Sequence, residues 1–409
     1  MTSAASVERA RAPAIILAIA ALAAPPVAVL APLGVAPLLT VVAVALLIAV
    51  PRALWEAMRP LRPFAALWVA LAAYGMVSAA WSVIPGHSLV ESARFLAIGI
   101  EGTIALAAAR MLSRRDGARI GLSAAIGVAL GAGLLLFEWK TGAALARWLH
   151  GWGPTTLVNP SRYDRGATTA VLIVWPAALA LRRWRMLQAA VGIAVAAAVS
   201  VMVSAASLLA LIAGFSGFVV ALRWPRLIAG ALAASIVLGA ALLPVAVPSY
   251  ETTVRIQHTT PWIKMSGIHR LLIWRFAADR IAERPWFGWG MDASRAMPGG
   301  NRDFGATLPG IELGPGHTAM PLHPHDALLQ WRLELGVPGT LLGVALILWA
   351  LYRVGWKFDL GREAQAMALG WGAAVTVIAL LSFGIWQEWW LSCILLTASL
   401  LAASATDGD

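Results

Sequence analysis

The chain has 409 residues, of which 60% are hydrophobic and only 12% are charged, and its formal net charge is +11. A soluble domain carries about 25% charged residues, so this composition excludes a soluble globular protein and predicts a polytopic membrane protein. The single cysteine, Cys393, excludes a disulfide framework and a thiolate metal site.

Apolar stretches of about the 20 residues needed to cross a bilayer recur along the chain. We therefore expect an all-α membrane protein with about twelve transmembrane helices, near 14–31, 33–50, 63–81, 89–109, 118–137, 166–181, 186–203, 206–222, 227–247, 337–354, 364–383 and 386–403. The first stretch also resembles a signal peptide, since Arg9 and Arg11 precede it and the word "ALA" at 21–23 could be a cleavage site. We interpret it as a transmembrane helix, because its removal would invert the charge pattern of every later loop.

The basic residues predict the orientation, because cytoplasmic loops hold an excess of Lys and Arg. With the N-terminus inside, the inner connections carry 17 of the 31 basic residues, and the short outer turns near 32, 82–88, 204 and 384 carry none. Both termini are then cytoplasmic. Because this bias explains much of the net charge, the high isoelectric point does not indicate nucleic-acid binding.

Two outer segments are long, 138–165 and 248–336. Loops of this length are usually functional, so we divide the chain into an N-terminal bundle (1–247), a periplasmic loop (248–336), and C-terminal spans with a cytoplasmic tail (337–409). The second loop holds five of the seven histidines and nine basic residues. The orientation rule would place those basic residues on the other face, so we expect another role for them.

Within the second loop, 268–283 predicts a helix that Pro285 ends, followed by a tight turn at Gly288 and Gly290. Arg270 falls on its apolar stripe with residues such as Ile273, which indicates that its guanidinium faces a partner. The alternative is an interfacial helix whose arginines contact lipid phosphates. The "GWG" word at 288–290 is no dinucleotide motif, because no strand precedes it.

The stretch "HPHDALLQWRLELGVPG" (323–339) predicts Asp326 as the N-cap of a helix over 327–335, with Pro338 in the first turn of the next span. His325 then lies before a helix N-terminus, whose dipole favours the neutral imidazole that a general base needs. The alternative is that His323 and His325 only line a membrane-surface turn. Two histidines with one aspartate lack zinc-site spacing, so we expect no metal.

The words "HRLLIW" (269–274), "RPWFGWG" (284–290) and "HPHDALLQWRLELGVPG", in this order, resemble the signature region of the O-antigen ligase and polymerase superfamily. Its members are polytopic bacterial glycosyltransferases that use polyprenyl-diphosphate-linked glycans. The resemblance implies a GT-C-like membrane fold. It covers the C-terminal part of the chain in its motifs, while the number of spans and the position of the loop agree over the whole length.

Carried over, the family's His followed by Asn matches His325 and Asp326, and the basic residue four positions before a Trp matches Arg270 and Trp274. The aspartate departs from the family pattern. It should place a negative charge beside the proposed base and raise the pKa of the imidazole.

The family's glycine pair matches Gly336 and Gly339. Members also often carry an arginine in a Ser-rich word at the outer end of an upstream span, where this chain has Ser207. Arg165 is our candidate to replace it, and the alternative is a charge that only ends a helix.

The resemblance implies transfer of a glycan from undecaprenyl diphosphate to an acceptor hydroxyl, with lipid A-core as the expected acceptor, at the periplasmic face of the bacterial inner membrane. His325, with His323 beside it, would deprotonate the acceptor, and the transfer would invert the anomeric centre without a cofactor or metal. Arg270 with Arg165 or Arg284 would hold the diphosphate.

Further candidates and rival functions stay open. Trp274 could stack on a glycan, and Arg94 is a weaker substrate-binding candidate that could instead pair with Glu91. An O-antigen or exopolysaccharide polymerase and a protein O-oligosaccharyltransferase would share the motif. A transporter or flippase for an anionic lipid-linked substrate is the alternative of another class.

Overall fold

The computed structural model describes residues 4–153, 155–159, 162–202, 204–357 and 360–405. No strand occurs in these ranges, only an isolated bridge between Asp303 and Thr318. The predicted all-α fold is confirmed. Residues 406–409, the end of the predicted cytoplasmic tail, lie outside the described residues.

Each of the twelve predicted spans falls on a helix. These helices are α1 (Ala4–Leu30), α2 (Val35–Ala49), α4 (Arg62–Ser78), α5 (Pro85–Ala109), α6 (Arg114–Thr141), α8 (Arg162–Ala180), α9 (Arg185–Val201), α10 (Ala205–Ala221), α11 (Pro225–Ala246), α15 (Ala327–Tyr352), α16 (Arg362–Leu381) and α17 (Glu388–Ser404). Short elements between them are α3 (Pro51–Ala57), η1 (Arg59–Leu61), α7 (Ala144–His150) and η3 (Arg353–Lys357).

Among the described residues, seven helices could cross a membrane by length and composition, or eight if α2 and α3, bent by 108°, form one span. The helices α9, α10 and α17 are apolar but have only 17 residues each, and α8 begins with three charged residues in its first turn. For these four helices a complete crossing stays a prediction.

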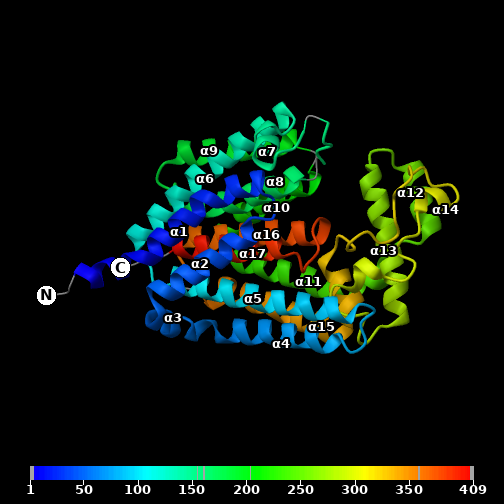
Figure 1. The fold of residues 1–409 in the computed structure, drawn as a ribbon, viewed down its shortest axis with the longest axis horizontal. Helices are drawn as coiled ribbons and strands as arrows, with labels where there is room; N and C mark the ends of the chain where they lie inside the picture. Colours follow the sequence, from blue (N-terminus) through cyan, green and yellow to red (C-terminus); the bar gives the residue numbers. More distant parts are fainter. Residues whose placement is uncertain (1–3, 154, 160–161, 203, 358–359, 406–409) are drawn as a thin grey trace.

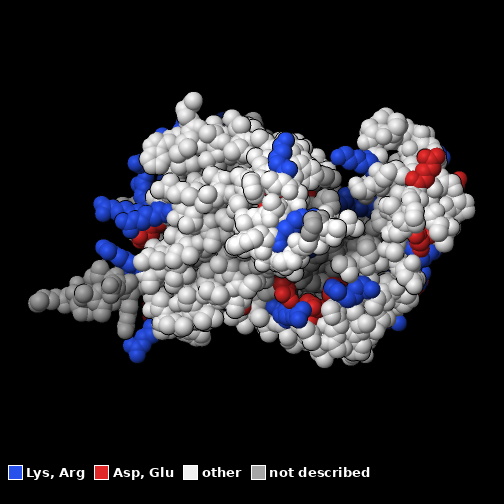
Figure 2. All heavy atoms as spheres, turned by 45° about the horizontal axis from the view of Figure 1, so that its top comes forward, with Lys and Arg blue, Asp and Glu red and all other residues white. Residues whose placement is uncertain are grey.

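The apolar helices lie side by side in one bundle (Figure 1). Both ends of the described chain lie at one end of the bundle, and the helices of the second long loop form a lobe at the opposite end (Figure 1). In Figure 2, Lys and Arg side chains gather at the end that carries the termini. This distribution agrees with the charge bias that underlies the predicted orientation.

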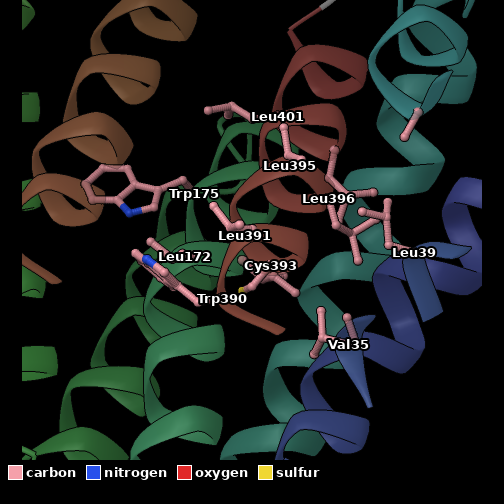
Figure 3. Packing of buried hydrophobic residues seen from close by; sticks show 14 of the residues in the cluster. Val35, Leu39, Leu172, Trp175, Trp390, Leu391, Cys393, Leu395, Leu396 and Leu401 are labelled. Atoms are coloured by element: carbon pink, nitrogen blue, oxygen red, sulfur yellow. The ribbon is translucent and has the colours of Figure 1, made fainter. Parts of the chain in front are cut away.

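Near the centre of the bundle, Trp390 and Leu391 of α17 lie beside Leu172 and Trp175 of α8 (Figure 3). Leu396 of α17 lies on the other side of the helix, beside Leu39 of α2 (Figure 3). Small residues let neighbouring helices approach closely. A Cβ on Gly214 of α10 would lie 2.9 Å from the Gly370 oxygen of α16. Such close contacts between small residues are typical of helix pairs in membranes.

The lobe consists of α12 (Tyr250–Thr259), α13 (Met265–Glu283), η2 (Ala293–Ala296) and α14 (Phe304–Thr307). The predicted helix over 268–283 is confirmed as α13, and Gly288 and Gly290 adopt positive φ angles of 70° and 104° in the turn after it. Its apolar stripe packs against α15, since Leu272 and Ile273 share one buried cluster with Leu329. The lobe is therefore held on the bundle by an apolar contact.

The start of α15 is built as the sequence indicates. Asp326 is the N-cap, its carboxylate accepting from the Leu329 N–H at 2.8 Å. Gly336, with φ 60° and ψ −151°, breaks α15 into two parts, so the predicted end at 335 is confirmed. A Cβ on Gly336 would lie 2.1 Å from the Trp286 oxygen, which explains why glycine is required.

The turn at 286–290 and the break in α15 hold each other. Val337 N–H donates to the Trp286 carbonyl at 2.9 Å, and Gly290 N–H donates to the Glu334 carbonyl at 2.8 Å. Two of the three signature words therefore meet through their backbones. This contact fixes the start of α15, and with it the histidine stretch that precedes α15.

Candidate active site

His325 lies before the first turn of α15 and has a positive φ of 59°. Its Nδ1 atom lies 2.6 Å from the Ser382 carbonyl oxygen in the connection between α16 and α17. A carbonyl only accepts hydrogen bonds, so Nδ1 carries the proton of the neutral ring and Nε2 keeps its lone pair. The geometry gives His325 the tautomer that a general base requires.

Burial lowers the pKa of His325 to about 4, and the positive charge of Arg270 acts in the same direction. The expectation that Asp326 raises this pKa is wrong. The Asp326 carboxyl group is turned toward the N–H of Leu329, and burial raises its own pKa to about 7. The imidazole is therefore neutral at physiological pH, as expected, and burial is the main cause.

His323 packs against His325, with ring centroids 4.3 Å apart. Its Nδ1 accepts from the His325 backbone N–H at 3.1 Å, and its Nε2 lies 3.2 Å from the Gln387 side-chain amide. Burial, and next the neighbouring His325, lower the pKa of His323 well below its ordinary value. His323 is thus a neutral support that orients His325.

Trp274 of α13 lies beside this pair. Its indole N–H donates to the Pro324 carbonyl at 2.9 Å, between the two histidines. The contact fixes the histidine stretch onto α13. The indole N–H therefore has a structural role, and the contact of the Trp274 ring with a glycan stays a prediction.

Arg270 and Arg165 come together at the site although they lie on different helices. Asp164, in the first turn of α8, interacts electrostatically with both guanidinium groups, and Arg270 also acts on His325. Arg165 lies 5.6 Å from the ring centroid of Trp389. Its Nε atom is buried and has no hydrogen-bond partner among the described residues.

Ser207 lies next to this pair of arginines. Its hydroxyl is 3.1 Å from that of Thr168 on α8 and 2.9 Å from that of Ser204. The Ser204 side chain in turn binds Asp164. The position at which family members often carry an arginine therefore packs on the first turns of α8, beside Arg165.

The other two predicted arginines have other partners among the described residues. Arg284 follows α13, about 21 Å along the helix axis from Arg270, where it contacts the Trp81 carbonyl at 3.3 Å and the Trp289 ring at 4.0 Å. Arg94 pairs with Glu91 at 2.9 Å, as expected, and also with Glu388 at 3.1 Å.

The sequence reasoning missed Glu334, which is completely buried in α15. Its carboxylate accepts from the backbone N–H of Asp292 at 2.8 Å, from the N–H and hydroxyl of Ser294, from the Gln330 amide and from the Trp386 indole. It connects α15 to residues 292–294 of the lobe and to Trp386, which precedes α17. A carboxylate three residues before the predicted span at 337–354, in the helix predicted over 327–335, was the signal that could have identified it.

One group of potential metal ligands occurs among the described residues: His87, Glu91 and Asp292, whose ligand atoms lie within 4.8 Å of one another. Their charges are already compensated by the protein. His87 lies 2.7 Å from Asp292, and Arg295 pairs with Asp292 at 2.7 Å, while Glu91 is paired with an arginine as described above. A site without metal stays our prediction.

Figure 2 shows that the surface is hollowed between the bundle and the lobe, with basic and acidic side chains at the edge of the hollow. A neutral imidazole with a free Nε2 can remove a proton from a hydroxyl group. Two neighbouring guanidinium groups can hold an anion such as a phosphate. The arrangement therefore suits acyl or glycosyl transfer to a hydroxyl with an anionic leaving group.

Residues 203–344 match the model of the protein family described as O-Antigen ligase. The chain is also similar to proteins named "Putative polysaccharide ligase" from three Rickettsia species. These are Rickettsia conorii, 30% identical over 164 residues (39% of this chain and 37% of the relative), Rickettsia prowazekii, 34% over 128 residues (31% and 29%), and Rickettsia typhi, 33% over 130 residues (31% and 30%). The matches span less than two fifths of the length of these relatives.

The matched region includes α13 with Arg270, the histidine stretch and the break in α15. Through this region, the chain is similar to the O-antigen ligase family.

Proposed function

We propose that the protein transfers a glycan from undecaprenyl diphosphate to an acceptor hydroxyl, with lipid A-core as the expected acceptor. The reaction takes place at the periplasmic face of the bacterial inner membrane, and both termini are cytoplasmic. The observation that carries this proposal is the tautomer of His325. Its Nδ1 is committed to the Ser382 carbonyl, so Nε2 is free to accept a proton beside two arginines.

In the transfer, Nε2 of His325 removes the proton of the acceptor hydroxyl as its oxygen attacks the anomeric carbon. The bond between that carbon and the phosphate oxygen breaks, and the electron pair leaves with undecaprenyl diphosphate. Attack opposite the leaving group inverts the anomeric centre. The proton stays on His325 until the product departs and is then released to water.

Arg270 and Arg165 hold the departing diphosphate. The unpartnered Nε of Arg165 supports this role, because a buried donor without an acceptor is costly unless a ligand satisfies it. Guanidinium groups bind phosphate oxygens in bidentate fashion and remain charged at any working pH. Asp164 balances their charge before the donor arrives.

The donor also makes the base stronger. A pKa of about 4 keeps His325 neutral but gives it little affinity for a proton. A bound diphosphate adds negative charge nearby and raises this pKa, which brings the imidazole closer to the working pH. Proton removal is thereby favoured only when the donor is in place.

The test is a gel of surface glycolipid from a source bacterium deleted for this protein and complemented with wild type, His325→Ala or His258→Ala, at matched membrane levels. His258 is an exposed histidine of the same lobe that contacts the Gly310 carbonyl, so it is a matched control. We expect His325→Ala to lose the polymer ladder on lipid A-core while long polymer accumulates on undecaprenyl diphosphate, and His258→Ala to retain the ladder.

Other outcomes would contradict the proposal in distinct ways. Single-repeat caps in the deletion strain would indicate a polymerase, and a normal ladder with His325→Ala would remove this residue from catalysis. A ladder that survives the deletion itself would direct the search to protein glycosylation or to transport.

A further inference from the structure

The first long outer segment, 138–165, has a defined structure that the proposed function does not use. The buried Glu138 carboxylate accepts from the backbone N–H groups of Leu145 and Ala146 at 2.8 and 3.0 Å and so caps α7. Arg147 donates to the carbonyls of Gly142, Gly153 and Thr156 at 2.9, 2.5 and 2.8 Å. These bonds hold the segment in one shape around a hollow.

The hollow is an open pocket of about 340 Å³. Trp139, Tyr163 and Val158 form its apolar part, and Thr155, Thr156 and Arg147 form its polar part. The volume lies at the small end of the range of ligand pockets, roughly 300–1,000 Å³. It suits one or two small rings.

The lining indicates a neutral, polyhydroxylated ligand. The rings of Trp139 and Tyr163 meet edge to face, with centroids 5.8 Å apart. Tyr163 is buried, so the half-buried Trp139 offers the main aromatic surface of the pocket. The threonine side chains are exposed beside them. Apolar ring surface combined with a few hydroxyls matches a sugar, which has apolar C–H faces and a polar rim.

Arg147 does not favour an anion in this pocket. Three of its five N–H groups, on Nε, Nη1 and Nη2, already donate to backbone carbonyls and shape the segment. Only two N–H groups remain for a ligand, fewer than a free guanidinium offers to a phosphate. We therefore favour the glycan over a phospholipid headgroup.

The pocket lies beside the proposed reaction centre. Tyr163 lines the pocket and directly precedes Asp164 and Arg165 in the first turn of α8. The pocket and the arginines thus share one helical turn and are separated by about the width of a helix, 10–12 Å. A glycan held at the arginines could extend to the pocket over a few sugar units.

We propose that this pocket binds a sugar unit of the glycan substrate some units away from the reacting bond, which rests on the proposed glycan transfer. Sugars of the donor polymer and of the acceptor core share the required chemistry. Two probes distinguish them: lipid-free polysaccharide released from the strain's own lipid-linked pool, and core oligosaccharide from its delipidated lipopolysaccharide.

Binding of each probe to the purified full-length protein is measured by calorimetry for wild type and three variants. Thr156→Trp fills the pocket from an exposed position, and Trp139→Ala removes an aromatic wall. Trp148→Ala is the matched control, because Trp148 is 76% exposed on α7 and does not line the pocket.

We expect Thr156→Trp and Trp139→Ala to weaken binding of one probe about tenfold, the effect of losing one aromatic contact. The KM of the matching substrate should rise by a similar factor at constant kcat, and Trp148→Ala should behave as wild type. Because Thr156→Trp removes no packed side chain, it keeps the test valid if Trp139→Ala fails to fold.

The inference is overturned if wild type binds neither probe, or if Thr156→Trp binds both as tightly as wild type does. Probe binding that the pocket variants weaken, in a protein that transfers no glycan, would support the pocket and reject the proposed transfer. The two proposals can therefore fail separately.

Discussion

The Nδ1 atom of His325 and the carbonyl oxygen of Ser382 lie 2.6 Å apart, although 57 positions separate the two residues. This contact joins the stretch before α15 to the connection before α17. Because the carbonyl can only accept, it fixes the ring proton on Nδ1 and leaves Nε2 as the atom that can receive a proton.

The pH dependence of glycan transfer should report the low pKa of His325. The pKa of His325 in the free protein is about 4. We therefore expect the profile of kcat/KM against pH to show no inflection near pH 6.5, the ordinary pKa of histidine, and to fall only near pH 4. The profile is also measured in Asp326→Asn, because the pKa of Asp326 is about 7 and its titration could be mistaken for that of an ordinary histidine. An acid limb at or above pH 6.5 in Asp326→Asn would refute the buried, neutral imidazole.

Asp326→Asn should stabilise the protein at pH 8 and stabilise it less at pH 5. Burial raises the pKa of Asp326 to about 7, so its contribution to folding is present at low pH and is lost as the pH rises through 7. Asparagine retains an oxygen for the Leu329 N–H and does not ionise. Thermal unfolding in detergent at both pH values gives the Tm difference.

Asp303→Asn is the control of opposite sign. Hydrogen bonds from the Gly316 and Gly305 N–H groups hold the pKa of Asp303 below its ordinary value, so its carboxylate stabilises the fold at neutral and alkaline pH. We expect Asp303→Asn to lower the Tm at pH 8. The same sign of change in both variants would show that the charge of Asp326 is not the cause.

Arg270→Ala and Arg165→Ala should each lower kcat/KM for the lipid-linked donor by about 100-fold, since each removes a cation from the leaving group. Arg255→Ala, an exposed arginine of the lobe, is the matched control and should leave the rate unchanged. Arg284→Ala should lower the Tm, through loss of its contact with the Trp289 ring, and leave the donor KM unaltered. A larger kinetic effect at Arg284 than at Arg165 would place the diphosphate elsewhere.

Glu334→Gln should destabilise the protein by about 2–4 kcal/mol. Every hydrogen-bond partner of the Glu334 carboxylate is a donor. The side-chain amide of glutamine would turn its own N–H group toward at least one of these donors. The Tm in detergent and hydrogen exchange at residues 290–294 measure the effect. Glu312→Gln, at an exposed position, is the control. Equal Tm values for the two variants would contradict a stabilising role of the buried Glu334 carboxylate.

Gly336→Ala should prevent stable accumulation in the membrane. Its φ of 60° with ψ of −151° is accessible to glycine only, and an added Cβ would lie 2.1 Å from the Trp286 oxygen. Gly133→Ala is the matched control, because Gly133 is helical with open space around it, where alanine favours the helix. Normal levels of Gly336→Ala would show that the break in α15 tolerates another geometry.

Much of the fold could be predicted from the sequence because its signals are local. Apolar length located the helices, Pro285 and the glycines located the end of α13 and the turn after it, and Asp326 with Gly336 located the two ends of the short helix before the break. Each of these signals acts within a few residues of itself. A hydrophobic run cannot show, however, whether a short helix such as α9 crosses the bilayer completely.

The site depended on the tertiary structure, because its partners are distant in sequence and its electrostatics come from burial. His325 could be identified as a candidate base from its place before α15, but only packing against the Ser382 connection decided its tautomer and lowered its pKa. Arg165 and Arg270 were separate candidates in the sequence until the fold brought Asp164, which precedes Arg165 on α8, close to Arg270 on α13. The sequence by itself determined which residue types could do the chemistry, and the packing of α8, α13 and the ends of α15 and α17 decided which of them meet, since burial and opposing charges arise only where helices touch.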